Sequence, residues 1–278
     1  MRGRICFVFI FFMAALAAKS QYFYKDIILI KQTRDNWKLF HNLKVHAANI
    51  ESIDANDQPV PGFTCTQTIS SDFLTITTFT KSVDVPASSL FANYDQNGFL
   101  IKTTDTSDTF IATTDYTYNE KGEVSSLLNI SQETDNRITA PEKHIWLYTD
   151  GRPKQMIKIK ENTDTTYVNL ILDEKGNVIE EKSVHGQQTL PSVYYYYDNE
   201  NRLTDIVRYN EKAARLLPDY VFEYKYDRIS SMLFVPPGSN DYQKWIYSYD
   251  TSGLKKNESC FDKKKNLIVK INYTYSFQ

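Results

Sequence analysis

A short motif that recurs along the later two thirds of the chain is the feature that most limits its fold. The motif is aromatic-x-Tyr-(Asp/Asn)-x-x-(Gly/Asn), and its most aromatic copy begins with the run from Tyr194 to Asp198. The closest clear copies, at 95 and 119 and at 173 and 198, lie 24 or 25 residues apart, which predicts one β-hairpin per period. The clear copies place their acidic or amide residue and their closing residue at Asp95 and Gly98, Asn119 and Gly122, Asp173 and Gly176, Asp198 and Asn201, and Asp250 and Gly253.

The chemistry of the turn predicts how the strands on either side of each copy pair. Asp or Asn favours the first position of a type I turn, and a left-handed Gly or Asn three residues later closes a three-residue hairpin loop with a bulge. With the acidic or amide residue as position 0, position −1 then pairs with position +5. The predicted pairs are Tyr94 with Leu100, Tyr118 with Val124, Leu172 with Val178, and Tyr197 with Leu203.

These copies resemble the YD-repeat family, the tandem β-hairpins of Rhs-type shells and wall-associated proteins. They are more similar still to the shorter exported YD-like proteins of unknown function of Bacteroidota. The resemblance covers residues 92–278 and rests on the Tyr-x-Tyr-Asp-x-x-Gly pattern; the longer consensus of Rhs repeats is missing. It implies an extended, curved or spiralling antiparallel sheet, and it implies no activity.

The residues before the repeats also favour strands. Two short apolar runs, 26–30 and 37–40, are typical of strands, and residues 63–80 alternate with many Thr and Ser. No stretch of this region shows a helical period over 11 residues or more. We therefore expect an all-β protein, an extended or curved antiparallel meander. An N-terminal Thr-rich segment (21–90) would share the sheet of the repeat region (91–278) or lie in a neighbouring one, and whether the sheet closes is left open.

The first 20 residues have the form of a secretory signal peptide. Arg2 and Arg4 precede an apolar run from residue 5 to 18, which is shorter than the ~20 residues of a membrane-spanning helix. Its removal leaves 29 basic residues against 34 acidic ones, a balance that argues against nucleic acid as a partner. We expect a secreted, periplasmic or cell-surface protein with no transmembrane helix after processing. Of the three cysteines, Cys65 and Cys260 would remain and could form a disulfide.

No motif in the sequence assembles a catalytic or metal site. The four histidines are scattered, the acidic residues lie mostly in turns, and nucleophile-elbow, zinc-protease and phosphate-loop motifs are all missing. We therefore expect no enzymatic activity, no cofactor and no metal. The face shared by positions −1 and −3 of the repeats is expected to form the core. Tyr194 and Tyr196 lie on the opposite face and are the candidate ligand-binding residues.

The leading hypothesis is a non-enzymatic exported structural or binding module of the periplasm or cell surface, whose partner would be a cell-envelope protein or a glycan. Two alternatives remain open: a carbohydrate-binding protein that uses exposed aromatic side chains, and a small outer-membrane β-barrel. Charged residues argue against lipid on either side of the strand at 178–183, because alternation places Glu180 and Lys182 on one face and Glu181 on the other.

Overall fold

The computed structural model describes residues 22–83, 85–133, 141–211, 213–236, 239 and 241–278. Within these residues, one helix precedes all of the strands. The elements are α1 (Lys25–Leu43), β1 (Val45–Ile53), β2 (Thr64–Ile69), β3 (Thr75–Lys81), β4 (Ser88–Tyr94), β5 (Leu100–Ser107), β6 (Phe110–Tyr118), β7 (Val124–Glu133), β8 (Glu142–Thr149), β9 (Arg152–Lys160), β10 (Asp164–Leu172), β11 (Val178–His185), β12 (Gln188–Thr189), β13 (Val193–Tyr197), β14 (Leu203–Asn210), β15 (Arg215–Lys225), β16 (Arg228–Phe234), β17 (Gln243–Tyr249), β18 (Lys255–Phe261) and β19 (Leu267–Phe277).

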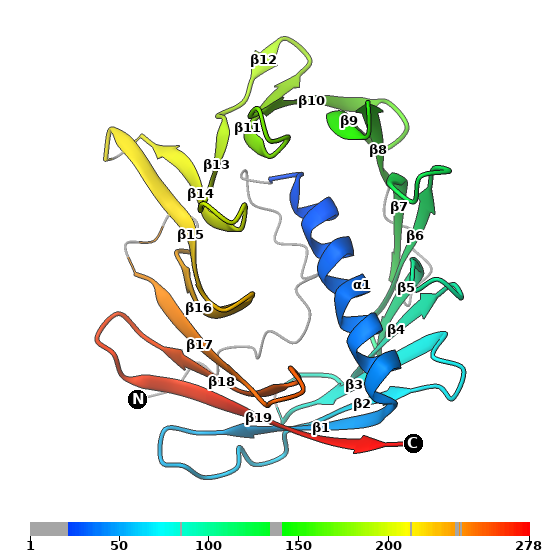
Figure 1. Ribbon diagram of the computed structural model, residues 1–278, viewed down its shortest axis with the longest axis vertical. Coiled ribbons are helices and arrows are strands. Elements are labelled where there is room, and N and C mark those ends of the chain that lie inside the picture. The colour runs from blue at the N-terminus through cyan, green and yellow to red at the C-terminus, as the bar shows by residue number, and fades with distance from the viewer. Residues whose placement is uncertain (1–21, 84, 134–140, 212, 237–238, 240) are drawn as a thin grey trace.

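The strands form one closed antiparallel β-barrel. Consecutive strands pair along the chain, except that β11 pairs directly with β13 and the two-residue β12 lies beside the ring. The last strand, β19, pairs with β1, which also pairs with β2, so the sheet has no free edge (Figure 1). The predicted all-β antiparallel meander is therefore confirmed, and the question of closure that the sequence left open is answered. The predicted boundary between residues 90 and 91 falls inside β4 and separates no structural units.

The hairpin turns have the geometry that the repeat predicts. All four predicted pairs between positions −1 and +5 occur in the register, each next to a bulge. In the first copy the Asp95 carboxylate accepts hydrogen bonds from the N–H groups of Asn97 and Phe99, at 2.9 and 2.8 Å. The acidic side chain thus satisfies backbone donors of the turn, which explains why Asp or Asn recurs there. The closing residues Gly98, Gly122, Gly176, Asn201 and Gly253 all have positive φ.

Tyrosine hydroxyls join several of the hairpins to the one before. Tyr197 at position −1 donates its hydroxyl hydrogen to the carbonyl oxygen of Val178, the residue at position +5 of the preceding hairpin. The same bond recurs around the barrel, which gives the repeat a physical reason to use Tyr rather than Phe. These bonds measure 2.8 to 3.0 Å and join Tyr118 to Leu100, Tyr197 to Val178, Tyr224 to Leu203, Tyr249 to Ile229 and Tyr275 to Lys255.

The prediction of strands at 26–30 and 37–40 was wrong, because both lie in helix α1. The buried helical positions are Asp26, Thr33, Trp37 and Phe40, a spacing of 7, 4 and 3 residues that follows the helical period. Two of the four are polar, and the apolar run at 27–30 covers several sides of the helix. Ile27, Ile30, Leu39 and Leu43 pack against the same core but are only partly buried, and the polar Asp26 and Thr33 interrupt the apolar spacing that would have marked a helix.

The helix lies inside the barrel and packs on the aromatic face of the repeats (Figure 1). Tyr195 lies at position −3 of its copy, and Trp146 belongs to a weaker copy of the motif. Both point to the inner face and are almost completely buried. They belong to the same core cluster as Trp37 and Phe40 of α1. The prediction that positions −1 and −3 form the core is confirmed, but nothing in the sequence indicated that a helix would cover them.

Candidate functional site

Helix α1 crosses the interior of the barrel, and both ends of the helix contact the barrel wall (Figure 1). At its C-terminal end, the indole N–H of Trp37 donates to the carbonyl oxygen of Phe73 at 2.7 Å, and the ring of Phe40 lies 6.2 Å from that of Tyr275. At its N-terminal end, the chain enters a cluster of buried polar side chains from β8, β9, β11 and β13. Of the three charged side chains that are buried among the described residues, Asp26 and Glu181 both lie here, which makes this cluster a candidate site.

Glu181 on β11 binds the backbone just before the helix. Its side chain is 1% exposed, and its two oxygens accept the N–H groups of Phe23 and Tyr24 at 3.0 Å and the hydroxyl of Tyr195 at 2.9 Å. Burial raises the pKa of Glu181, and the hydrogen bonds to the carboxylate act against that rise. Because three donors converge on it, the carboxyl group acts as an acceptor, next to the positive end of the helix dipole.

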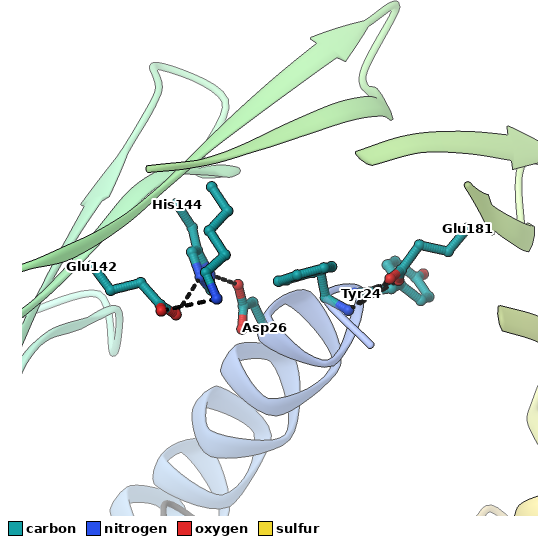
Figure 2. Close-up of polar contacts among 7 residues, drawn as sticks. Tyr24, Asp26, Glu142, His144 and Glu181 are labelled. Atoms are coloured by element: carbon teal, nitrogen blue, oxygen red, sulfur yellow. Dashed lines mark hydrogen bonds and ion pairs between the residues drawn. The ribbon is translucent and has the colours of Figure 1, made fainter. Parts of the chain in front are cut away.

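A second set of charges lies on the other side of the first helical turn (Figure 2). The His144 imidazole on β8 lies between two carboxylates, with Nδ1 2.6 Å from Asp26 and Nε2 3.0 Å from Glu142. Lys158 on β9 contacts Glu142 at 2.9 Å. Burial alone would lower the pKa of His144, but Asp26 and Glu142 outweigh it and raise the pKa to about 9. The hydrogen bond from His144 is the main reason that the pKa of Glu142 falls to about 2.

The Glu181 contacts and the His144 contacts both attach helix α1 to the barrel wall. At neutral pH His144 is an imidazolium whose two N–H groups both point at carboxylates, so it offers no lone pair to act as a base. Among the described residues, no group of three or more His, Cys, Asp or Glu side chains has the arrangement of a metal site. The sequence could not reveal these pairs, because Asp26 and His144 are 118 residues apart. Their joint effect is to fix the start of α1 to the barrel wall.

The two tyrosines predicted from the sequence lie on the outer face of β13. Tyr196 is 48% exposed, whereas Tyr194 is partly covered. Tyr196 borders an open groove of about 460 Å³ between the β10–β11 turn and the β13–β14 turn, and Tyr194 does not line it. The groove residues are Asp173, Glu174, Lys175, Asn177, Ile179, Tyr195, Tyr196, Tyr197, Asp198, Asn199 and Asn201.

Two neighbouring turns of the predicted set meet at this groove. Asn177 donates from its side-chain amide to Asp173 in its own turn at 2.9 Å and to Asn201 of the next turn at 3.2 Å. Asp198 is occupied by the backbone of its turn and by Arg202. The turns at Asp95, Asn119 and Asp250 belong to other hairpins and do not line this groove.

Cys65 and Cys260 are both buried, and no disulfide joins them in this structure. They occupy the same inner apolar cluster, but Cys65 lies on β2 and Cys260 on β18. Strands β1 and β19 separate them, and adjacent strands lie about 4.8 Å apart, so the two α-carbons are too distant for a disulfide. The bond that the sequence left open is therefore not formed here.

The outer face of the barrel differs from one side to the other. On β2 and β3 the outward positions are largely Thr, and the outward Lys102 of β5 and Asp115 of β6 form an ion pair at 3.4 Å, with side chains 44% and 49% exposed. From β7 to β11 the outer face carries more exposed apolar residues, among them Ile130, Leu147 and Ile171. None of the described helical segments combines the length and the apolar character that a transmembrane helix requires.

Comparisons with known proteins add little to this picture. No protein-family model and no curated protein matches the chain. Among solved structures, a porin-like protein from Bacteroides uniformis is similar with a TM-score of 0.40 and 9% identity, covering 84% of this chain and 98% of that one. A putative 6-phosphogluconolactonase from Bacteroides fragilis has a TM-score of 0.19 and 11% identity, with coverage of 84% and 98%. TM-scores this low assign no function to the chain.

Proposed function

We propose that the protein is a non-enzymatic structural or binding module of the cell envelope, exported through the signal peptide expected at residues 1–20. That segment lies outside the described residues. The repeats of this module would be of the YD type that their sequence resembles. In this proposal the closed barrel is a rigid support, α1 fills part of its interior, and partners bind at the outer surface and the turns. The interior supports this, because its buried carboxylates and His144 bind one another and the helix.

The polar and charged side chains on the outer face of β1 to β6, which lie among the exposed apolar Phe79, Ile101 and Ile111, are the observation that carries the proposal. Lys102 and Asp115 face outward from neighbouring strands, and Asn49 and Thr66 do so on β1 and β2. A Lys that faces lipid near the middle of a bilayer costs about 2–4 kcal/mol, whereas water solvates all of these groups. A barrel with this side in contact with water is therefore favoured over one surrounded by lipid.

An outer-membrane β-barrel is the second candidate. The observations that favour it are the closed ring, which leaves no edge strand unpaired, and the apolar part of the outer face between β7 and β11. In that case only part of the circumference would have the apolar surface that a spanning barrel shows on all sides. The two candidates differ in the phase from which the folded protein is recovered.

Fractionation of a Gram-negative host that produces the full chain separates them. We expect the processed protein in the soluble envelope fraction, folded without detergent, with a mature N-terminus between residues 18 and 21. Far-UV circular dichroism of that fraction should show a β-sheet spectrum. Recovery only from the outer-membrane fraction with detergent would contradict the module and support the second candidate, and an uncleaved cytoplasmic product would contradict export.

A further inference from the structure

The groove beside Tyr196 has a floor and a rim of different chemistry. Tyr196 and Ile179 supply apolar surface from the outer faces of β13 and β11, and both are exposed. The rim comes from the two turns and includes the amides of Asn177, Asn199 and Asn201. The groove has a volume of about 460 Å³ and is largely open to solvent, so a ligand there would contact it on one face only.

The presence of Tyr196 has no explanation in the hairpin itself. At the same place in other copies of the repeat the chain has Thr117 or Ser248, and those hairpins close in the same register. Other exposed tyrosines exist, such as Tyr167 on the outer face of β10, but Tyr167 does not line this groove. Tyr196 therefore differs from Tyr167 in lying in a groove that polar residues of two turns also line.

We propose that this groove binds a neutral saccharide, with one sugar ring stacked on Tyr196. A pyranose has an apolar C–H face and a rim of hydroxyls that both donate and accept hydrogen bonds. The aromatic ring of Tyr196 can stack on the C–H face. The side-chain amides, which also donate and accept hydrogen bonds, can bind the hydroxyls. This inference rests on the proposed function, because it names the ligand class of a binding module.

The charges around the groove disfavour an anionic ligand, even though Arg202 offsets the charge of Asp198. Asp173, Glu174 and Asp198 line it together with a single cation, Lys175. A phosphate or an acidic sugar would meet net negative charge, whereas a neutral sugar would not. Asp173 and Asp198 are also occupied by their own turns, which leaves Glu174 and the amides of Asn199 and Asn201 as the groups best placed to contact hydroxyls.

Calorimetric titration of the processed full-length protein with neutral oligosaccharides tests the proposal. The probes are maltohexaose, cellohexaose, xylohexaose, mannohexaose and N-acetylchitohexaose. We expect at least one to bind, and Tyr196→Ala to weaken that binding at least about tenfold, the loss of a ring-stacking contact. Asn199→Ala, at an exposed turn position, should weaken it less, and Tyr196→Leu provides a variant with an apolar side chain retained if the Ala variant misfolds.

Tyr167→Ala is the matched control, because Tyr167 is also 48% exposed on the outer face and lies outside the groove. It should bind as tightly as the unmodified protein. Failure of all five sugars to bind, or equal binding by the Tyr196 variants, would overturn the saccharide proposal and leave the soluble envelope module in place. The opposite failure, a protein found only in membranes, would overturn the module whatever the titration shows.

Discussion

Replacement of Glu181 by Ala is expected to lower the free energy of unfolding by about 3–5 kcal/mol. The change leaves three buried donors without a partner, the N–H groups of Phe23 and Tyr24 and the hydroxyl of Tyr195. Each orphaned donor costs about 1–3 kcal/mol, less where water reaches the cavity that the side chain vacates. Urea unfolding followed by tryptophan fluorescence measures the loss.

Glu180→Ala is the control for this prediction. Glu180 precedes Glu181 on β11, points outward and pairs with Lys182 at 3.3 Å. Its replacement should therefore change the free energy of unfolding by less than about 1 kcal/mol. Equal stabilities of the Glu181 and Glu180 variants would contradict the account of how α1 is attached. A large loss only at Glu181 would support it.

Gly98→Ala is expected to destabilise the protein by about 2–5 kcal/mol. Gly98 has a φ of +74°, and an added β-carbon would lie 2.2 Å from the ring of Trp37, which is buried in α1. The backbone conformation costs an Ala side chain about 1–2 kcal/mol, and displacement of a packed ring costs about 1–3 kcal/mol more. The effect should appear as a lower midpoint of thermal unfolding.

Gly186→Ala separates the two contributions. Gly186 has a φ of +57°, but an added β-carbon there would meet nothing within 4 Å. Its cost should therefore be the backbone cost alone, about 1–2 kcal/mol. A Gly98 variant no less stable than the Gly186 variant would show that Trp37 is not packed against this turn.

The hairpins could be predicted because their information is local. Asp198 and Asn201 fix the turn, and the turn fixes the pairing of Tyr197 with Leu203 a few residues away. One detail of the hairpins could not be predicted from the sequence. Alternation from Val178 places Glu180 on the inner face, but the bulge beside Val178 shifts the register, so that Glu181 points inward instead.

The helix, the closure and the polar cluster could not be predicted because each depends on residues far apart in the chain. Asp26 and Thr33 look like surface positions until His144 and the barrel interior are placed beside them. Pairing of β1 with β19 brings the start of the sheet to its end, and no local pattern distinguishes this from an open meander. The outward position of Tyr196 followed from the repeat, whereas the groove needed two turns side by side.

The central claim is that the sheet closes between β1 and β19, and an engineered disulfide tests it most directly. Asn49 and Thr274 face each other in the register of that pairing, and both side chains are exposed. In the processed full-length protein, Asn49→Cys combined with Thr274→Cys should cross-link on mild oxidation, as should the control Thr77→Cys combined with Phe91→Cys on β3 and β4. The closed barrel predicts that oxidation removes two reactive thiols from each double variant and that the Asn49–Thr274 pair, which closes a long loop, also migrates faster on a non-reducing gel. A cross-link in the control pair alone would contradict closure.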